Sequence, residues 1–171
     1  ADATSFDVFT PLEGDTVAGS LPESAPFVLS SPEFRQINIA TRDITPDEGD
    51  RFDSGSWDMH TVNENGPEAG RYLFTVYETS QAGIQRTDLR NMQTETIWAS
   101  PAAAPALDSY VAFDASRWTP WGSFLTAEES WSDPAGPTSI YGRLFEVVNP
   151  LAAPEDIVIK HRDILPRVSH E

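Results

Sequence analysis

Cysteine is absent from this chain of 171 residues, as are the common fingerprints of hydrolases and nucleotide-binding proteins. Without cysteine there is no disulfide, no thiolate metal site and no cysteine nucleophile. The three histidines, His60, His161 and His170, do not have the spacing of a zinc hydrolase. The chain also has no P-loop, no dinucleotide-binding glycine pattern and no G-x-S-x-G elbow. No familiar motif therefore supports any of these classes of site.

Positive charge is scarce. The chain has 11 lysines and arginines against 27 aspartates and glutamates, with Lys160 as the only lysine, and its formal net charge is −16. Such a surface repels nucleic acid and anionic membranes and attracts divalent cations. A solvated surface suited to a salty environment has the same composition. No apolar run approaches the roughly 18 residues that span a bilayer. We therefore expect no nucleic-acid partner and no membrane span.

The first residues are small and polar, with neither an initiator methionine nor the apolar core of a signal peptide. This start fits cleavage after a secretory signal, although a cytosolic protein trimmed at its start would look the same. We expect a periplasmic or secreted protein.

The 14 prolines and 10 glycines divide the chain into short segments rich in Val, Ile, Phe, Tyr, Trp and Thr. No helical apolar period is sustained, so the pattern predicts a nearly all-β fold. Residues 1–35 are the least regular part, and residues 1–56 are expected to form an N-terminal arm and an irregular β segment. An acidic stretch that begins in this part, residues 42–58, lacks the EF-hand spacing and favours a solvated loop.

An internal repeat follows the irregular part. "GRYLFTVYE" (Gly70 to Glu78) aligns with "WGSFLTAEE" (Trp121 to Glu129), and each stretch is followed by a glycine and two further strands. A segment with a weaker strand pattern precedes each of the two aligned stretches. The repeat of about 50 to 60 residues with three or four strands is typical of a propeller blade. We expect blades over residues 57–108 and 109–166, and the start of a further blade at 167–171.

Two blades would expose large apolar faces, because a propeller closes with roughly four to eight of them. The sequence therefore predicts an incomplete β-propeller, a fragment of a larger one whose remainder is the partner. The alternative is a self-contained small β-sandwich.

Glutamates end the two aligned strands. In a propeller the first strand of each blade lines the channel, and we expect Glu78 and Glu128 at equivalent ends of such strands. Converging carboxylates repel one another unless they are protonated or bridged by a cation such as calcium, magnesium, manganese or iron. Glu171 is a possible third ligand. The alternative is that these glutamates only cap strand ends.

The stretch "RWTPWGSFLTAEESW", Arg117 to Trp131, resembles the T-P-W-G-[ST]-[WF]-L-T-[AC]-E-E motif of the PhoX-type bacterial alkaline phosphatases. "YGRLFEVVNP" and "LPRVSHE" are similar to later family segments. The resemblance covers about residues 70–171. It implies an exported β-propeller that hydrolyses phosphate monoesters with calcium and iron held by carboxylates, with Glu128 as the first metal ligand and Glu78 and Glu171 as further ones.

One family feature is absent. Members carry an Asn-Cys-Ala-Gly-Gly type segment before T-P-W-G whose cysteine helps to hold the iron pair, whereas this chain has "FDASRW", Phe113 to Trp118. The resemblance thus implies part of a metal-dependent phosphoester hydrolase that uses calcium, with iron in doubt. The alternative is a noncatalytic propeller that serves as a binding or structural subunit.

Overall fold

The structure is a computed structural model that describes residues 21–22, 28, 36–39, 56–101, 109–129 and 140–171. The chain divides into two units, residues 1–44 and 45–171. In the first unit the few described residues form neither helix nor strand. The predicted N-terminal arm and the acidic stretch 42–58 lie almost wholly outside the described residues.

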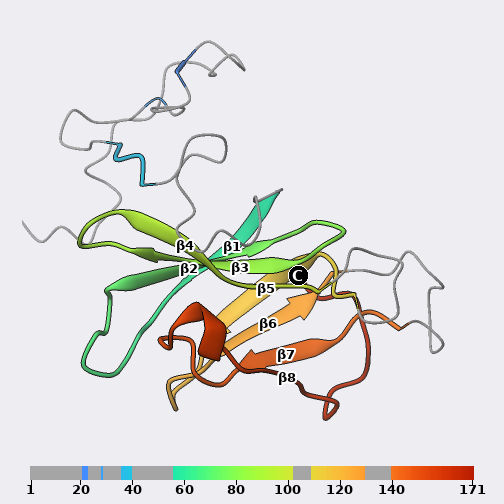
Figure 1. Ribbon diagram of the computed structural model, residues 1–171. Coiled ribbons are helices and arrows are strands. Elements are labelled where there is room, and N and C mark those ends of the chain that lie inside the picture. The colour runs from blue at the N-terminus through green and yellow to red at the C-terminus, as the bar shows by residue number, and fades with distance from the viewer. Residues whose placement is uncertain (1–20, 23–27, 29–35, 40–55, 102–108, 130–139) are drawn as a thin grey trace, which may run out of the picture. The chain divides into compact units, whose positions relative to one another are not determined.

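The second unit contains two four-stranded antiparallel sheets, and in each the strands follow one another in chain order (Figure 1). Sheet A consists of β1(Trp57–Val62), β2(Tyr72–Tyr77), β3(Gly83–Asp88) and β4(Gln93–Ala99). Sheet B consists of β5(Phe113–Trp118), β6(Phe124–Glu128), β7(Leu144–Val147) and β8(Ile159–His161), with the 3-10 helix η2(Pro154–Asp156) before β8.

The all-β prediction is confirmed. Among the described residues neither sheet closes on itself, and no helix there is long and apolar enough to cross a membrane. Both sheets therefore keep open edges.

The two sheets share a bulge as well as a strand order. The register between the first and second strands shifts between Trp57 and His60 in sheet A, and between Phe113 and Ser116 in sheet B. In both cases the first strand carries one extra residue. A bulge re-aims the side chains beside it and is a specific feature of a sheet. The repeat seen in the sequence thus corresponds to two sheets of the same design.

The first strand of each sheet differs from the one that we expected. The sequence placed β2 and β6 first and treated the segments before them as weak, but β1 and β5 begin the sheets, and β2 and β6 are interior strands. The physical reason is the bulge, which breaks the alternation of apolar and polar residues by which a strand is recognised.

An aromatic core joins the sheets. Phe74 of β2 stacks on Trp118 of β5 at 5.6 Å and on Phe124 of β6 at 5.2 Å between ring centroids. Their neighbours in this core are Val76, Ala82, Ile84, Ile97, Phe113, Phe145 and Val147, all buried. Burying large aromatic side chains is among the strongest contributions to a core of this size.

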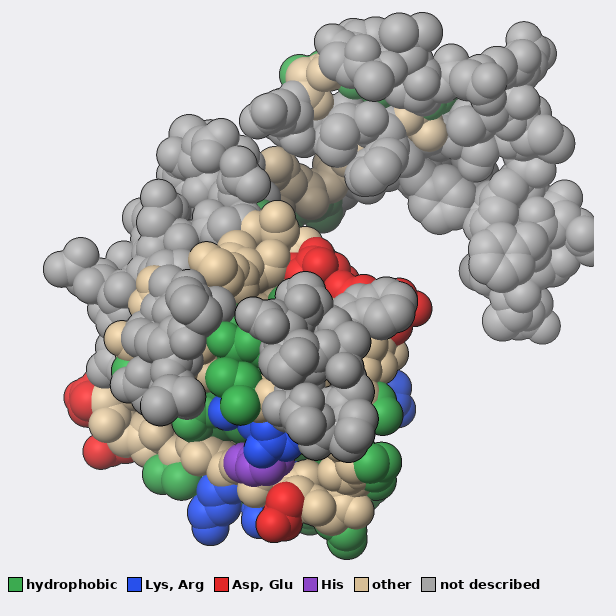
Figure 2. Space-filling view, turned by 90° about the vertical axis from the view of Figure 1, so that its right-hand side faces the viewer, with side chains coloured by type: hydrophobic (Ala, Val, Ile, Leu, Met, Phe, Trp, Pro, Cys, Tyr) green, Lys and Arg blue, Asp and Glu red, His purple; other side chains and the backbone are tan. Residues whose placement is uncertain are grey.

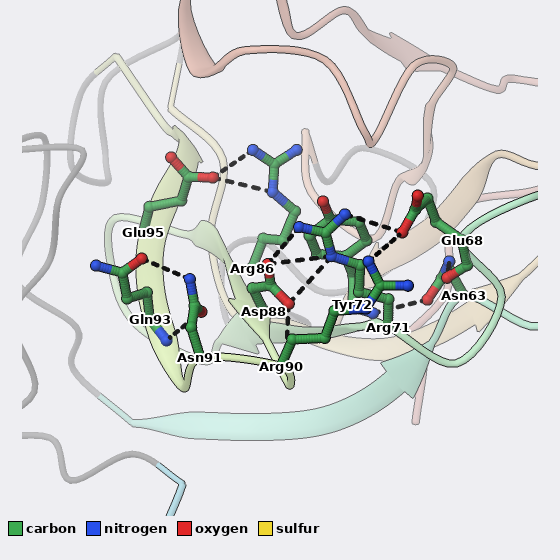
Figure 3. A network of polar contacts seen from close by, with 10 residues as sticks. All are labelled: Asn63, Glu68, Arg71, Tyr72, Arg86, Asp88, Arg90, Asn91, Gln93 and Glu95. Carbon is green, nitrogen blue, oxygen red and sulfur yellow. Dashed lines mark hydrogen bonds and ion pairs between the residues drawn. The ribbon is translucent and has the colours of Figure 1, made fainter.

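A polar network covers part of sheet A (Figure 3). Arg71 donates from Nε to both carboxylate oxygens of Asp88 at 3.1 Å, and from Nη1 to Glu68 at 2.9 Å. The ring of Tyr72 lies near two guanidinium groups, 4.7 Å from that of Arg71 and 5.5 Å from that of Arg86. Since these charges are paired with one another, the network holds the β2–β3 hairpin together.

Polar contacts also join the two sheets. Arg86 donates to the backbone carbonyls of Pro150 and Ala152, at 3.0 and 2.8 Å. At the other end Asn65 donates to the carbonyls of Thr119 and Pro120 and accepts the indole N–H of Trp118 at 3.0 Å. The T-P-W turn is therefore held by sheet A, and the buried Trp118 packs there.

Candidate functional site

Four carboxylates occupy matching positions in the two sheets. Asp58 and Asp114 are the second residues of β1 and β5, inside the bulges. Glu78 follows β2 and donates its backbone N–H to Ser56 O at 2.9 Å, while Glu129 follows β6 and donates to Ala112 O at 2.8 Å. We call Asp58, Glu78, Asp114 and Glu129 the acidic cluster.

The members of the acidic cluster contact one another across the sheets. Glu78 shares side-chain hydrogen bonds with Glu129 and with Asp58, and Asp58 shares one with Asp114. A hydrogen bond between two carboxyl groups requires that one of them keep its proton. The cluster therefore brings carboxyl groups of sheet A and sheet B within hydrogen-bonding reach of one another, where a proton or a cation between them is favourable.

Two members have raised pKa values. The hydrogen bond from Glu129, then burial, then the charges of Glu129 and Asp58 raise the pKa of Glu78 to about 7. Burial, then the hydrogen bond and charge of Asp58, and the charges of Glu129 and Glu171 raise the pKa of Asp114 to about 6. Asp114 is only 7% exposed. Like charges in one place with little water favour either protons or a bound cation.

The donor chemistry of the cluster suits a hard cation, because calcium prefers carboxylate oxygens. Among the described residues, however, no three His, Asp or Glu side chains are grouped closely enough to hold one metal ion. The cluster thus provides pairs of ligands rather than a complete site.

Charged side chains of both signs lie on the surface. In the view of Figure 2 some Asp and Glu side chains gather at the upper part of the described region, others lie at its left edge and near its foot, and several Lys and Arg side chains surround a histidine. Acidic and basic side chains therefore lie side by side on part of this face.

Glu171 lies near the cluster, since its charge contributes to the raised pKa of Asp114. The backbone N–H of His170 donates to Glu128 O at 3.2 Å, and Ser169 Oγ donates to Glu129 O at 3.3 Å. These contacts hold the last residues along the end of β6. Two predicted ligands, Glu78 and Glu171, thus lie in one region.

Glu128 lies elsewhere. Its carboxylate is fully buried and accepts from Arg143 Nη2 at 2.6 Å, from Arg143 Nε and backbone N–H at 3.0 Å each, and from the backbone N–H of Val111 at 3.2 Å. Arg143 also donates to Ser109 O at 2.7 Å. A cation at Glu128 would have to displace this guanidinium.

The structure corrects the pairing of Glu78 with Glu128. The equivalent of Glu78 is Glu129, because both donate their backbone N–H to the residue that precedes the first strand. Consecutive residues of a strand point to opposite faces, so Glu128 points to Arg143 and Glu129 to Glu78. The alignment of "TVYE" with "TAEE" contained this signal.

The equivalent of Glu128 in sheet A is Tyr77. Its hydroxyl lies 2.9 Å from Thr96 Oγ1, and its ring covers Gly83, where an added Cβ would stand 2.6 Å from Cδ2 of the ring. Sheet A thus has a tyrosine and a glycine where sheet B has the Glu128–Arg143 pair.

Asp58 and Asp114 were not singled out from the sequence. The pattern that could have identified them is an aspartate directly after an aromatic residue, since Asp58 follows Trp57 and Asp114 follows Phe113. Of the tryptophans, Trp118 is packed, whereas Trp121 is 72% exposed and donates its indole N–H to Glu146 Oε1 at 2.8 Å.

Comparison of the chain with protein-family models, with curated proteins and with solved structures gives no match.

Proposed function

We propose that the two sheets are consecutive blades of a β-propeller and that the acidic cluster binds calcium in a phosphoester hydrolase of the PhoX type. The observation that carries the proposal is the recurrence of an aspartate and a glutamate at matching positions of both sheets, in contact with one another. Strand order and bulge position support equivalent blades. Iron is not included, since the chain has no cysteine.

The carboxylates have distinct parts in this proposal. Glu78 and Glu129 face one another from the two sheets, so a cation between them would relieve the repulsion that raises the pKa of Glu78. Asp114 and Glu171 add negative charge on one side. The remainder of the propeller supplies further ligands. A bound calcium would polarise phosphoryl oxygens and stabilise the charge of the transferring group.

The test is hydrolysis of p-nitrophenyl phosphate by the protein as isolated from its source. We expect chelation to abolish activity and added calcium to restore it. Glu129→Gln should lower activity at least tenfold, because it removes one bridging charge, whereas Glu155→Gln, an exposed glutamate of η2, should leave it unchanged. Activity that survives complete removal of metal, or none with any metal, contradicts the proposal.

A second candidate is a noncatalytic calcium-binding or structural subunit of an extracytoplasmic assembly. The specific observation in its favour is the pairing of Glu128 with Arg143, because the PhoX resemblance assigns a metal to Glu128. The two functions differ in one result. Calcium that raises the melting temperature of the wild type but not of Glu129→Gln, without hydrolysis of any ester, favours the noncatalytic subunit.

A further inference from the structure

Trp121 of the T-P-W turn is exposed and yet held in place. Its indole N–H donates to Oε1 of Glu146, a residue of β7, at 2.8 Å. The turn itself is fixed, because the Thr119 N–H donates to Ser123 O and the Ser123 N–H donates to Thr119 Oγ1, both at 2.9 Å. The only polar atom of the ring is therefore engaged, and the flat π face is what the ring offers to a partner.

One buried carboxylate holds Trp121 and Arg162 in a common arrangement. Oε1 of Glu146 accepts from Trp121, and Oε2 accepts from Arg162 Nε and Nη2, at 2.7 and 2.6 Å. Ser123 Oγ also donates to Oε1, and this hydrogen bond is the largest cause that lowers the pKa of Glu146 below its usual value. Because the charged Glu146 has a partner on each oxygen, the indole and the guanidinium are positioned before any ligand arrives.

Arg162 has donors left for a ligand. It engages Glu146 through Nε and Nη2, its side chain is partly exposed, and its Nη1 has no polar contact with the described part of the chain. Lys160 is exposed and lies directly opposite Glu146 across β7 and β8, so the two side chains leave the same side of the sheet. Since Arg162 neutralises Glu146, Lys160 adds positive charge here, in a protein whose net charge is −16.

The indole and the guanidinium together indicate the class of ligand. An exposed indole face stacks on a flat ring, which is an aromatic ring or the C–H face of a sugar. A guanidinium binds a carboxylate or a phosphate, and its charge repels a cation that would otherwise lie over the ring. The net negative charge of the protein disfavours a large polyanion. A small ring with one anionic group fits all of these conditions.

We propose that Trp121 and Arg162 bind a small ring compound that carries one anionic group, a sugar acid or an aromatic phosphate, with its ring on the indole and its anionic group at the guanidinium. The site lies at the opposite end of sheet B from the acidic cluster. The T-P-W turn follows the end of β5, whereas Asp114 lies near the start of that strand and Glu129 follows the end of β6. The site needs neither calcium nor catalysis.

The test is a ligand-observed NMR titration of the full chain in the presence of a chelator. The probes are glucuronate and phenyl phosphate, with glucose and phenol as their uncharged counterparts. We expect at least one anionic probe to bind with a dissociation constant of about 1 mM, the usual affinity of a ligand of about a dozen non-hydrogen atoms. The uncharged probes should bind at least tenfold more weakly. Binding of glucuronate alone assigns the site to sugar acids, and binding of phenyl phosphate alone assigns it to aromatic phosphates.

Variants connect this binding to the two side chains. Trp121→Leu and Arg162→Gln should each weaken binding at least tenfold, whereas Arg90→Gln, a change of an exposed arginine in sheet A, should leave it unchanged. The indole signals of the four other tryptophans show whether each variant is folded. Glu129→Gln should also leave binding unchanged, which separates this site from the proposed calcium site.

Three results would overturn the proposal. One is the absence of binding by both anionic probes at ten times the expected dissociation constant. The second is equal binding of the charged and the uncharged probes, because the guanidinium would then have no part in recognition. The third is binding that a folded Trp121→Leu variant leaves unchanged.

Discussion

The buried pair of Glu128 and Arg143 gives the sharpest prediction of this structure. Arg143→Met removes two side-chain hydrogen bonds to the carboxylate and one to Ser109 O, together with the contact of the guanidinium with the Tyr110 ring at 4.7 Å. It leaves a fully buried carboxylate with backbone donors only. Removing one partner of a buried ion pair costs about 3–5 kcal/mol. For a domain of this size we expect the melting temperature to fall by about 10–25 °C.

The equivalent position in sheet A indicates how to repair that loss. Tyr77 and Gly83 fill the matching space without any charge. The double variant Glu128→Tyr with Arg143→Gly should therefore be more stable than the sum of the single changes predicts, by about 1–3 kcal/mol, the usual coupling of residues in contact. The assay is urea unfolding of the wild type, both single variants and the double variant, with the midpoint compared at constant m value.

The outcome is decisive for the equivalence of the sheets. Strictly additive losses would show that the two positions are not interchangeable. A cost below about 1 kcal/mol for Arg143→Met would show that Glu128 is not held by the guanidinium.

Three further predictions concern the acidic cluster, the contact of Asn65 with the T-P-W turn, and the contact of Gly142 with Val168. Because the folded-state pKa of Glu78 is raised from 4.5 to about 7, the folded protein binds more protons than the unfolded protein between these pH values. The free energy of unfolding should therefore fall as pH rises from 4.5 to 7 without calcium. The melting temperature of Glu78→Gln should fall less over this range than that of the wild type. Asn65→Ala removes three hydrogen bonds between the sheets and should cost about 1–3 kcal/mol in urea unfolding, whereas Asn91→Ala in an exposed turn of sheet A should cost less. Gly142 has φ +75° and an added Cβ would stand 2.7 Å from Val168 O, so Gly142→Ala should speed hydrogen exchange of the Val168 amide; unchanged exchange would contradict the contact.

Much of the fold could be predicted from local pattern. Short β-rich segments between prolines and glycines gave the all-β class, and the aligned strands ending at Glu78 and Glu129 gave the two sheets. The first strands were harder, because Trp57–Val62 and Phe113–Trp118 contain a bulge and carry polar residues in buried places. A single sequence shows the alternation of apolar and polar residues along a strand, but it does not show the residue at which a bulge shifts that alternation.

For a similar reason the sequence did not show which carboxylates come together. Glu78 belongs to the acidic cluster and the charge of Glu171 acts on Asp114, another member. Glu128 does not join them, because one step along β6 reverses the direction of a side chain. Its partner Arg143 is 15 residues away, across a register that only pairing of β6 with β7 defines. Asp58 and Asp114 gain their importance from contacts between sheets, which no local pattern encodes.

The most direct test of the central claim is the position of calcium in crystals grown with the ion, located by anomalous scattering. The acidic cluster predicts a peak between Glu78 and Glu129, about 2.3–2.6 Å from an oxygen of each, with Arg143 still bound to Glu128. A peak at Glu128 with Arg143 displaced, or no peak at the cluster, would contradict the account.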